Sequence, residues 1–283
     1  MPAAKNIKEL YLMANTLRQD VITLLAAAQS GHTAGALGMA DIYAALFFSA
    51  MRYNPQRPES EDRDYLYLSN GHICPIHYAA MAEAGFFPRQ ELLTFRKLGS
   101  RLQGHPHNLS LPGIENSGGP LAQGLSQAAG CAKALKIDKK KNRVYCICSD
   151  GEHDEGQAWE AAMFAGNNKL DNLTLIMDRN NIQIDGFTND VMDLEPLNEK
   201  YIAFNWHVIE IDGHDMHAIL AALQEAKRTA NKPTIIIAKT IPGKGVTFMQ
   251  NKPEWHGKPP TQDEAAAALQ ELEEERASIE RAT

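Results

Sequence analysis

Cysteine is scarce in this sequence, and its four cysteines lack the spacing of a zinc or redox site. Cys74 and Cys131 stand alone, and Cys146 and Cys148 are separated by one residue rather than by the two of a C-x-x-C motif. On a strand, Cys146 and Cys148 would share one face, where a reduced thiol behaves as a small apolar group. Free thiols are typical of a reducing compartment, so we expect a cytoplasmic protein.

Long apolar runs and large basic blocks are also missing. No segment reaches the length of a membrane-spanning helix, and residues 1–10 lack the apolar core of a secretory signal. The net charge is -7, which disfavours nucleic acid as a partner. The one dense basic run, Lys139 to Arg143, is typical of a solvated loop. The sequence therefore predicts no membrane and no nucleic acid among the partners.

What is present is a regular alternation of strand and helix patterns over 283 residues, a length that allows a substantial core. The pattern predicts strands at 65–68, 143–148, 173–177, 207–211 and 234–238. It predicts helices at 7–28, 41–51, 121–136, 155–168, 193–203 and 215–230, and one more from about residue 75. Strands that alternate with helices form a parallel sheet covered on both faces. The expected fold is α/β, an open mostly parallel sheet with helices on both faces, in a single domain over residues 1–283.

Two segments depart from this alternation. Residues 99–120 are rich in glycine, proline, serine and asparagine, and a loop of this length in a compact domain is usually functional. We therefore expect an active-site loop at 99–120. Residues 262–283 are charged and rich in alanine, which predicts an exposed C-terminal helix that packs on the surface or on a partner.

Polar residues follow two neighbouring predicted strands, at 149–152 and 178–182. In open parallel sheets, ligands bind at the carboxyl ends of the strands. The Asp150 carboxylate, the Asn180 side-chain carbonyl and the Ile182 backbone carbonyl are oxygen ligands of the kind that Mg²⁺ takes when phosphate supplies the others. Asp-Gly and Asn-Asn pairs are also common turn residues, so the interpretation as a metal site depends on the whole ordered set.

The backbone at Gly151 would favour an anion at the same edge. Gly151 has no side chain, so its N–H can approach a phosphate oxygen, and the N-terminus of the following helix attracts negative charge. The run from Asp150 to Gly186 resembles the thiamine diphosphate motif, although Ser149 replaces the first glycine of its Gly-Asp-Gly opening. The resemblance implies that thiamine diphosphate is the cofactor. It would be held through Mg²⁺, or Ca²⁺ or Mn²⁺, by Asp150, Asn180 and Ile182.

Six segments in family order resemble transketolases. They are Ser30 to Gly35 with Ala40-Asp41, Leu68 to His72, Gly104 to Pro106, Gly119 to Gly124, Lys239 to Gly245, and Trp255 to Gly257. His107 is a departure, because the family usually has glutamate after His-Pro. The residues that the resemblance implies as cofactor contacts are His72, Gly119, Pro120, Leu121, Asp150, Gly151, Glu152, Asn180, Ile182 and His256.

Four of the ten histidines fall on these motifs, each close to a glycine. Transfer of a two-carbon ketol unit between sugar phosphates requires hydroxyl protons to move, and imidazole titrates in the suitable range. The resemblance implies that His32 and His256 handle donor hydroxyl protons and the developing oxyanion. It places His72 near the cofactor and His105 near the donor's hydroxyls. The histidines that we expect to be ordinary core or surface residues are His77, His153, His207, His214 and His217.

Full-length transketolases also carry a pyrimidine domain, and the resemblance in this chain stops near residue 260. That domain supplies a glutamate for the aminopyrimidine and basic residues for the sugar phosphate. The resemblance therefore implies the N-terminal subunit of a split transketolase. It would be active only with a separate C-terminal subunit, as an α2β2 assembly. Glu155 and Glu160 match glutamates at the family's subunit interface.

Two other functions fit parts of this pattern. The α subunit of a 2-oxoacid dehydrogenase E1 component also holds the metal–diphosphate motif without a pyrimidine domain. The segments at His32 and His256 favour transketolase instead. The alternative from another class is a non-catalytic thiamine diphosphate-binding subunit, and the retention of all four motif histidines argues against it.

Overall fold

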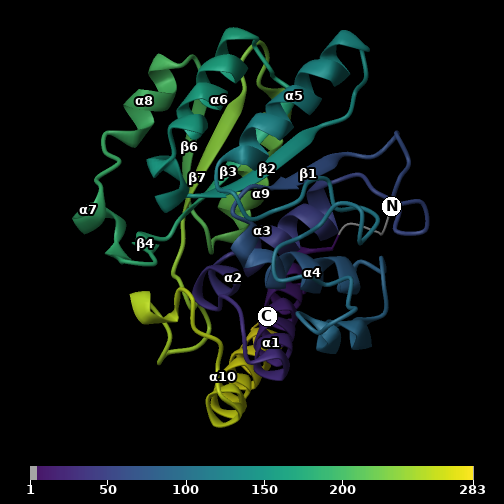
Figure 1. The fold of residues 1–283 in the computed structure, drawn as a ribbon, viewed down its shortest axis with the longest axis vertical. Helices are drawn as coiled ribbons and strands as arrows, with labels where there is room; N and C mark the ends of the chain where they lie inside the picture. The colour runs from purple at the N-terminus through teal and green to yellow at the C-terminus, as the bar shows by residue number, and fades with distance from the viewer. Residues whose placement is uncertain (1–4, 283) are drawn as a thin grey trace.

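A computed structural model describes residues 5–282 and contains a five-stranded sheet of order β1-β2-β3-β7-β6 (Figure 1). Every pair of neighbouring strands in it is parallel, which confirms the predicted fold class. The strands are β1 (Tyr65–Leu68), β2 (Val144–Ser149), β3 (Leu173–Arg179), β6 (His207–Asp212) and β7 (Thr234–Lys239). All five predicted strands are thus present, with bounds that differ by two residues or fewer.

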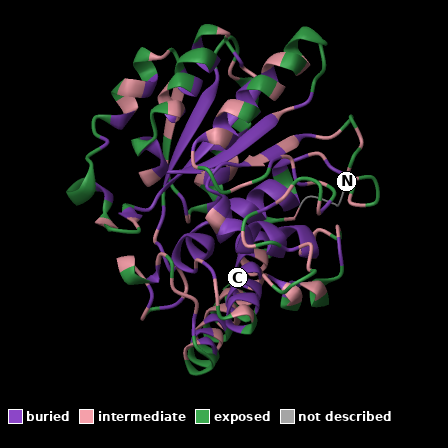
Figure 2. Cartoon of the chain, viewed as in Figure 1, coloured by how far each residue is buried: buried purple, intermediate pink, exposed green. Residues whose placement is uncertain are grey.

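The two faces of the sheet belong to two separate hydrophobic cores. On β2, Tyr145 and Ile147 face one core, whereas Val144, Cys146 and Cys148 face the other. Every residue of β2 and β3 is buried, as expected for central strands that are covered on both sides (Figure 2). All four cysteines are free thiols, in agreement with the sequence-based prediction.

The helices divide between these two cores. One face of the sheet carries α1 (Ile7–Ala28), α2 (Ala34–Gly38), α3 (Ala40–Ala45), α4 (Cys74–Glu83) and α9 (Met216–Arg228). The other face carries α5 (Gln123–Ile137), α6 (Gly156–Asn167) and α8 (Leu197–Ala203). Helices therefore cover both faces, as the strand and helix alternation predicts.

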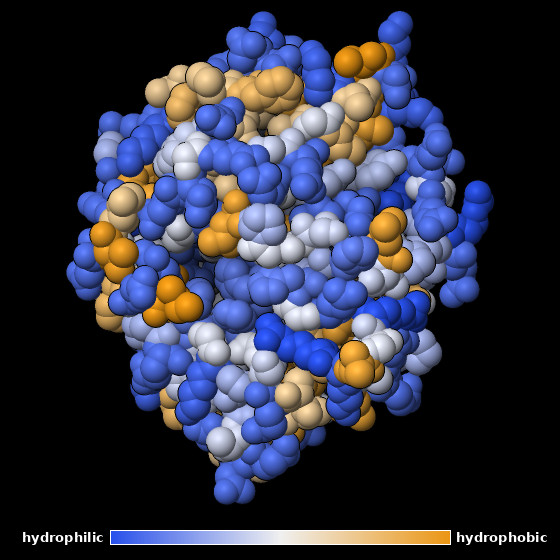
Figure 3. All heavy atoms as spheres, in the orientation of Figure 1, coloured by the Kyte–Doolittle hydropathy of each residue, from blue (hydrophilic) through white to orange (hydrophobic). Residues whose placement is uncertain are grey.

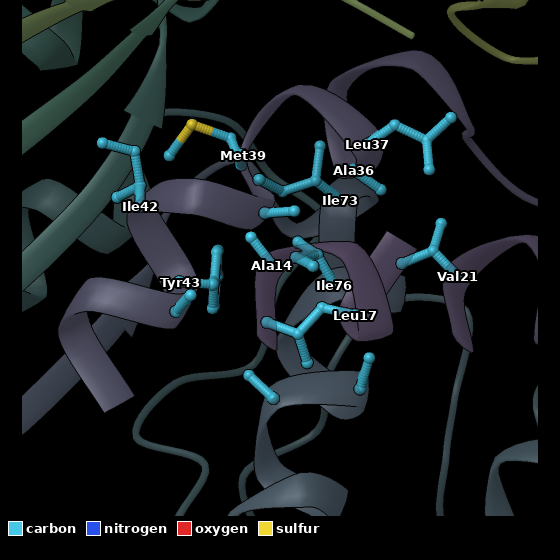
Figure 4. Close-up of a cluster of buried hydrophobic side chains, with 14 of the residues drawn as sticks. Ala14, Leu17, Val21, Ala36, Leu37, Met39, Ile42, Tyr43, Ile73 and Ile76 are labelled. Atoms are coloured by element: carbon cyan, nitrogen blue, oxygen red, sulfur yellow. The ribbon is translucent and has the colours of Figure 1, made fainter. Parts of the chain in front are cut away.

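Helix α1 lies at the centre of the larger core. Leu17 and Val21 lie on its buried side, near Leu37 of α2 and Ile76 of α4 (Figure 4). Full burial of each such aliphatic side chain contributes about 2 kcal/mol relative to exposure. A capping box at Asn6 satisfies the first free N–H groups of the helix.

The C-terminal helix α10 (Gln262–Arg281) packs along α1. Its buried residues are Ala265, Ala268 and Leu272, and the side-chain amide of Asn15 donates to the carbonyl oxygen of Leu272 at 2.8 Å. Its remaining residues are exposed or partly exposed, so the predicted helix is present and packs on the surface of this same chain.

Several short elements differ from the prediction. The helix expected at 41–51 ends as a π-helix, η1 (Leu46–Ala50). The helix expected at 193–203 begins only after Pro196, as α8, because the residue before a proline disfavours the helical conformation. A hairpin of β4 (Ile182–Gln183) and β5 (Gly186–Phe187), followed by α7 (Thr188–Val191), was not predicted, since its strands are too short to show periodicity.

The surface is largely hydrophilic on the face seen in Figure 3, where hydrophobic groups lie in separate places rather than in one continuous patch. Scattered apolar side chains of this kind are normal on a folded domain. No described helix is both long enough and apolar enough to cross a bilayer.

Candidate functional site

The carboxyl ends of four strands bring polar residues to one edge of the sheet. Asn70 lies just beyond β1, Asp150 follows β2, and Thr240 follows β7. Asp178 is the last residue but one of β3, and Asn180 follows that strand. Asp150, Asp178 and Asn70 are completely buried. The structure therefore places the predicted ligands Asp150, Asn180 and Ile182 at one edge, where parallel-sheet proteins bind ligands.

The Asp150 carboxylate is held by three donors. It accepts hydrogen bonds from the backbone N–H groups of Gly151 at 2.8 Å and Asn181 at 2.7 Å, and it pairs with the Arg179 guanidinium at 3.0 Å. Burial raises the pKa of Asp150, and the three donors oppose that rise. A carboxylate has about four acceptor positions. One position is therefore free, so Asp150 can serve as a one-oxygen metal ligand.

Asn180 is oriented by its neighbours. Its Nδ2 donates to Asp178 at 2.7 Å, and its Oδ1 accepts from the backbone N–H of Ile182 at 3.0 Å. Asp178 in turn accepts from the Thr240 hydroxyl, and burial raises the pKa of Asp178 to about 7. The Asn180 carbonyl oxygen is thereby held in place with a second lone pair available. Asp178 and Thr240 are positioning residues that the sequence alone did not single out.

The described residues hold no group of three or more His, Cys, Asp or Glu side chains that could bind a metal ion. Asp150 is the one carboxylate in the predicted set, beside an amide and a backbone carbonyl. Such a sparse oxygen set fits a cation that takes its other ligands from a diphosphate and water. The residues at this edge therefore suit a Mg²⁺–diphosphate pair better than a bare metal ion.

Arg179 is a second positioning residue that sequence reasoning missed. In addition to Asp150, it donates to Thr188 at 3.0 Å, Asn189 at 3.2 Å and Glu195 at 3.1 Å. These contacts tie the segment after the hairpin to the edge of the sheet that carries Asp150 and Asn180. The signal available in the sequence was an arginine at the buried end of a central strand, where a charge requires a partner.

The Glu152 side chain is turned into the protein. The residue is 1% exposed, and its carboxylate accepts hydrogen bonds from the Ser69 hydroxyl and from the backbone N–H groups of Ala122 and Ser149. Burial raises the pKa of Glu152 to about 7. Because protein donors already bond the Glu152 carboxylate, only the backbone of Glu152 remains for the cofactor contact that was predicted.

The loop that contains Gly119, Pro120 and Leu121 lies against the segment that follows β1. The Gly71 backbone is so close that a Cβ there would lie 2.8 Å from the Gly118 Cα and 2.9 Å from the Gly119 nitrogen. Gly119 has φ +125°, a conformation that favours glycine. Gly119 and Pro120 are exposed and Leu121 is half-buried, so this loop is accessible to a ligand.

Three of the predicted histidines form one cluster. Ring centroids are 5.1 Å apart for His32 and His72, 5.7 Å for His32 and His256, and 5.2 Å for His72 and His256. Burial and the neighbouring rings lower the pKa of His32 to about 4 and that of His72 well below its usual value, and burial lowers that of His256. The rings are therefore neutral near pH 7. Among the described residues, no partner bonds the buried Nδ1 atoms of His32 and His256.

The other predicted residues differ in their exposure. His105 is exposed on the loop at 99–120, which contains no helix or strand. Glu155 and Glu160 are exposed at the start of α6, where a contact with another chain is sterically open. The histidines His77 and His153, expected to be ordinary, are buried and hydrogen-bonded to Tyr43 and Tyr201 respectively.

His214 has a structural role that the sequence did not reveal. Its Nδ1 lies 2.8 Å from the Asp41 carboxylate, and its Nε2 accepts from the backbone N–H of Ile241 at 2.8 Å. Asp41 also pairs with the buried Arg18. This contact fixes the Lys239 to Gly245 segment against α3.

Comparison with known proteins agrees with this geometry. Residues 10–278 match the family model described as transketolase, thiamine diphosphate binding domain. The chain is 42% identical to the 6-deoxy-6-sulfo-D-fructose transketolase subunit of Clostridium sp. (strain MSTE9), over 94% of this chain and 97% of that protein. It is 36% identical to an apulose-4-phosphate transketolase subunit of Phocaeicola vulgatus, over 97% of this chain and 98% of that protein.

Solved structures show the same relationship. Transketolase from Leishmania mexicana superimposes with a TM-score of 0.87 at 31% identity, over 98% of this chain. The match covers 46% of that transketolase, so the chain spans about half its length. The resemblance inferred from the motifs is thus confirmed, and the chain belongs to the transketolase family, as a thiamine diphosphate-binding domain of the transketolase type.

Proposed function

We propose that this chain is the diphosphate-binding half of a two-chain transketolase that moves a two-carbon ketol unit from a ketose phosphate to an aldose phosphate. One observation carries the proposal. The oriented oxygens of Asp150 and Asn180 and the cluster of neutral histidines lie on the same domain of a transketolase-type fold.

The metal and cofactor would be held mainly by backbone and oxygen ligands. Asp150, Asn180 and the Ile182 carbonyl would bind Mg²⁺, with Ca²⁺ or Mn²⁺ as substitutes, and the metal would bind the diphosphate. Thiamine diphosphate, when bound, supplies the electron sink for cleavage of the ketose. The backbones of Gly151 and Glu152 and the loop at Gly119, Pro120 and Leu121 would contact the cofactor. His72 and His256 would contact it from the histidine cluster.

The neutral histidines would manage protons on the sugar. A neutral imidazole accepts a proton, so His32 and His256 suit removal of a hydroxyl proton from the donor, and the imidazolium formed stabilises a neighbouring oxyanion. Among the described residues, no group bonds the Nδ1 atom of either ring, so these nitrogens are left for a ligand. The exposed His105 would bind the donor's hydroxyls at the rim.

A second chain would complete the site. The relatives named above include proteins called subunits, whereas the Leishmania mexicana transketolase is about twice as long as this chain. The partner would carry the pyrimidine domain and would meet Glu155 and Glu160, and two copies of each chain would form an α2β2 assembly. Sugar phosphates are the proposed substrates.

The test is reconstitution. The purified chain alone should lack ketol transfer from xylulose 5-phosphate to ribose 5-phosphate, and should gain it when mixed with a chain that bears the pyrimidine domain. Calorimetry of the mixture with Mg²⁺ should show uptake of thiamine diphosphate, and Asp150→Ala should abolish that uptake. Full activity of this chain by itself would contradict the two-chain proposal.

The non-catalytic alternative calls for a separate measurement. In the reconstituted complex, His256→Ala should lower the turnover number at least tenfold while the cofactor still binds. His207→Ala provides a matched control, because His207 is a partly exposed histidine on β6, hydrogen-bonded to Glu225. An unchanged turnover number for His256→Ala would favour a binding role without catalysis.

A further inference from the structure

Asn116 lies on the loop at 99–120, shortly before Gly119, and its side chain is buried against strand β1. Its Oδ1 accepts from the backbone N–H of Leu68 at 3.0 Å, and its Nδ2 donates to the Leu68 carbonyl at 3.0 Å. Both hydrogen bonds are buried. A single side chain therefore satisfies both backbone groups of one strand residue.

Leu68 is the last residue of β1, which is an edge strand and pairs only with β2 in the described sheet. The next residue, Ser69, donates its N–H to Ile147 of β2 at 2.8 Å, so the backbone groups of Leu68 point to the side away from β2. The amide of Asn116 takes the place of a further strand there. Leu68 is 2% exposed, and a buried backbone group without a partner is destabilising. An amide suits this position because it carries a donor and an acceptor side by side.

Beyond this contact, the loop lies closely against the segment that follows β1. A Cβ at Gly71 would lie 2.8 Å from the Gly118 Cα, and a Cβ at Gly124 would lie 2.6 Å from the Ser69 Cα. Such short distances leave no room for the loop to slide along the segment that leads to His72. The loop is therefore held in one register from its first contact with β1 onward.

Two side chains hold the two ends of the proposed cofactor loop. Asn116 bonds strand β1 before the loop, and Glu152 accepts from the backbone N–H of Ala122 after it. Between these anchors, Gly119 and Pro120 are exposed. A loop whose ends are fixed loses less conformational entropy when it binds a ligand.

We infer that Asn116 is a positioning residue for the cofactor, because its two hydrogen bonds to Leu68 fix the loop at 119–121 where it would contact thiamine diphosphate. The inference rests on the proposed function, which assigns a cofactor contact to this loop. The role of Asn116 depends on both atoms of its amide. Variants that lose the donor, or the donor and the acceptor, should therefore release the loop.

Hydrogen exchange on the chain alone tests whether Asn116 holds the loop. Asn116→Leu removes both hydrogen bonds at a similar side-chain size. The backbone amide protons of Gly118 and Ala122 are hydrogen-bonded in the wild type, so their exchange reports release of the loop. In this variant both should exchange about tenfold faster.

Asn142→Leu is the matched control for this measurement. Asn142 is also a buried asparagine, and its amide donates to the backbone carbonyl groups of Glu61 and Arg63, at the amino end of β2. The control should leave the exchange of Gly118 and Ala122 unchanged. Equal acceleration in the two variants, or unchanged exchange in Asn116→Leu, would overturn the inference.

A second variant, Asn116→Asp, tests the two hydrogen bonds through their chemistry. The ionised carboxylate accepts from the Leu68 N–H but repels the Leu68 carbonyl, whereas the protonated carboxyl group can donate to that carbonyl as the amide does. Burial raises the pKa of a carboxyl group from its usual value of about 4. The faster exchange relative to the wild type should therefore diminish as the pH falls from about 8 to about 5. The adjoining Glu115 pairs with Arg63 in both proteins, so its titration cancels in this comparison. A difference that does not change with pH would contradict the role of the amide.

The reconstituted complex tests the connection to the cofactor. In calorimetry with Mg²⁺, Asn116→Leu should bind thiamine diphosphate about tenfold more weakly than the wild type, and Asn142→Leu should bind it as the wild type does. Wild-type affinity in Asn116→Leu would overturn the inference. If the wild-type complex itself takes up no thiamine diphosphate, the proposed function fails, whereas the exchange measurements on the chain alone still decide whether Asn116 holds the loop.

Discussion

The guanidinium of Arg179 lies 3.0 Å from the carboxylate of Asp150, and both side chains are almost entirely buried. The negative charge of Asp150, the candidate metal ligand, is therefore already balanced by the positive charge of Arg179. A divalent ion that approached Asp150 alone would meet this positive charge, whereas a metal–diphosphate pair brings its own negative charge. For the proposed metal site, the pairing would favour joint uptake of metal and cofactor over uptake of the metal alone.

Replacement of Arg179 by methionine should therefore destabilise the fold. The change leaves the Asp150 carboxylate buried without its ion pair, and breaking a buried pair costs about 3 kcal/mol. Urea unfolding of the chain alone measures the difference, with Lys232→Met as the exposed control. A free energy of unfolding within about 0.5 kcal/mol of the wild type would show that water replaces the guanidinium at no cost.

The Glu152 side chain should act as a structural junction, whereas the proposed cofactor contact involves only the Glu152 backbone. Glu152→Ala leaves the Ser69 hydroxyl and the N–H groups of Ala122 and Ser149 without their acceptor, which should cost about 3 kcal/mol of folding free energy. Glu152→Gln keeps one acceptor oxygen and should cost less than half as much. Thermal unfolding of the two variants checks this order, and equal losses would contradict the role assigned to the acceptor oxygens.

The close approach at Gly71 predicts a defect in cofactor binding. In Gly71→Ala, the new methyl group would push the loop at Gly118 and Gly119 away, so the affinity for thiamine diphosphate in the reconstituted complex should fall about tenfold or more. Gly130 in α5 provides the control, because a Cβ there meets no atom within 4 Å. Gly130→Ala should leave affinity unchanged and stabilise the helix by about 1 kcal/mol. Wild-type affinity in Gly71→Ala would show that the loop does not contact the cofactor.

His77 should make the fold sensitive to acid. Burial lowers the pKa of His77 to about 4, from 6.5 in the unfolded chain. Between these values the unfolded state binds the proton more tightly. Stability is therefore complete above pH 6.5 and falls as the pH is lowered toward 4, by about 1.4 kcal/mol per pH unit from this ring. In His77→Gln the unfolding free energy should lose that part of its pH dependence, and an unchanged slope would contradict a neutral buried His77.

The parts of the fold and site that could be predicted depend on patterns of residues that are close together in the sequence. Apolar segments of the sequence predicted β2 and β3. Asp150 directly follows β2, and Asn180 directly follows β3. The prediction ended the second of these strands at Met177, yet β3 continues through Asp178 and Arg179. Polar residues usually end a buried apolar strand, but here Asp178 and Arg179 each form hydrogen bonds with other buried groups.

The contacts that were missed join residues far apart in the chain. Glu152 meets Ser69 across 83 positions of the chain, and Asp178 meets Thr240 across 62. No spacing rule connects such pairs, because the sheet order that brings β1, β2, β3 and β7 together is not encoded in any local pattern. The same holds for Asp41 and His214, which join α3 to the segment before α9.

The cluster of His32, His72 and His256 has a consequence for how the site responds to acid. A proton added to one ring places a charge within 5.1 to 5.7 Å of the two other ring centres, and this charge disfavours a second protonation. Titration of one ring therefore depends on the charge of the other two. The apparent pKa values in a pH–rate profile would belong to the cluster of three rings and not to any one of them.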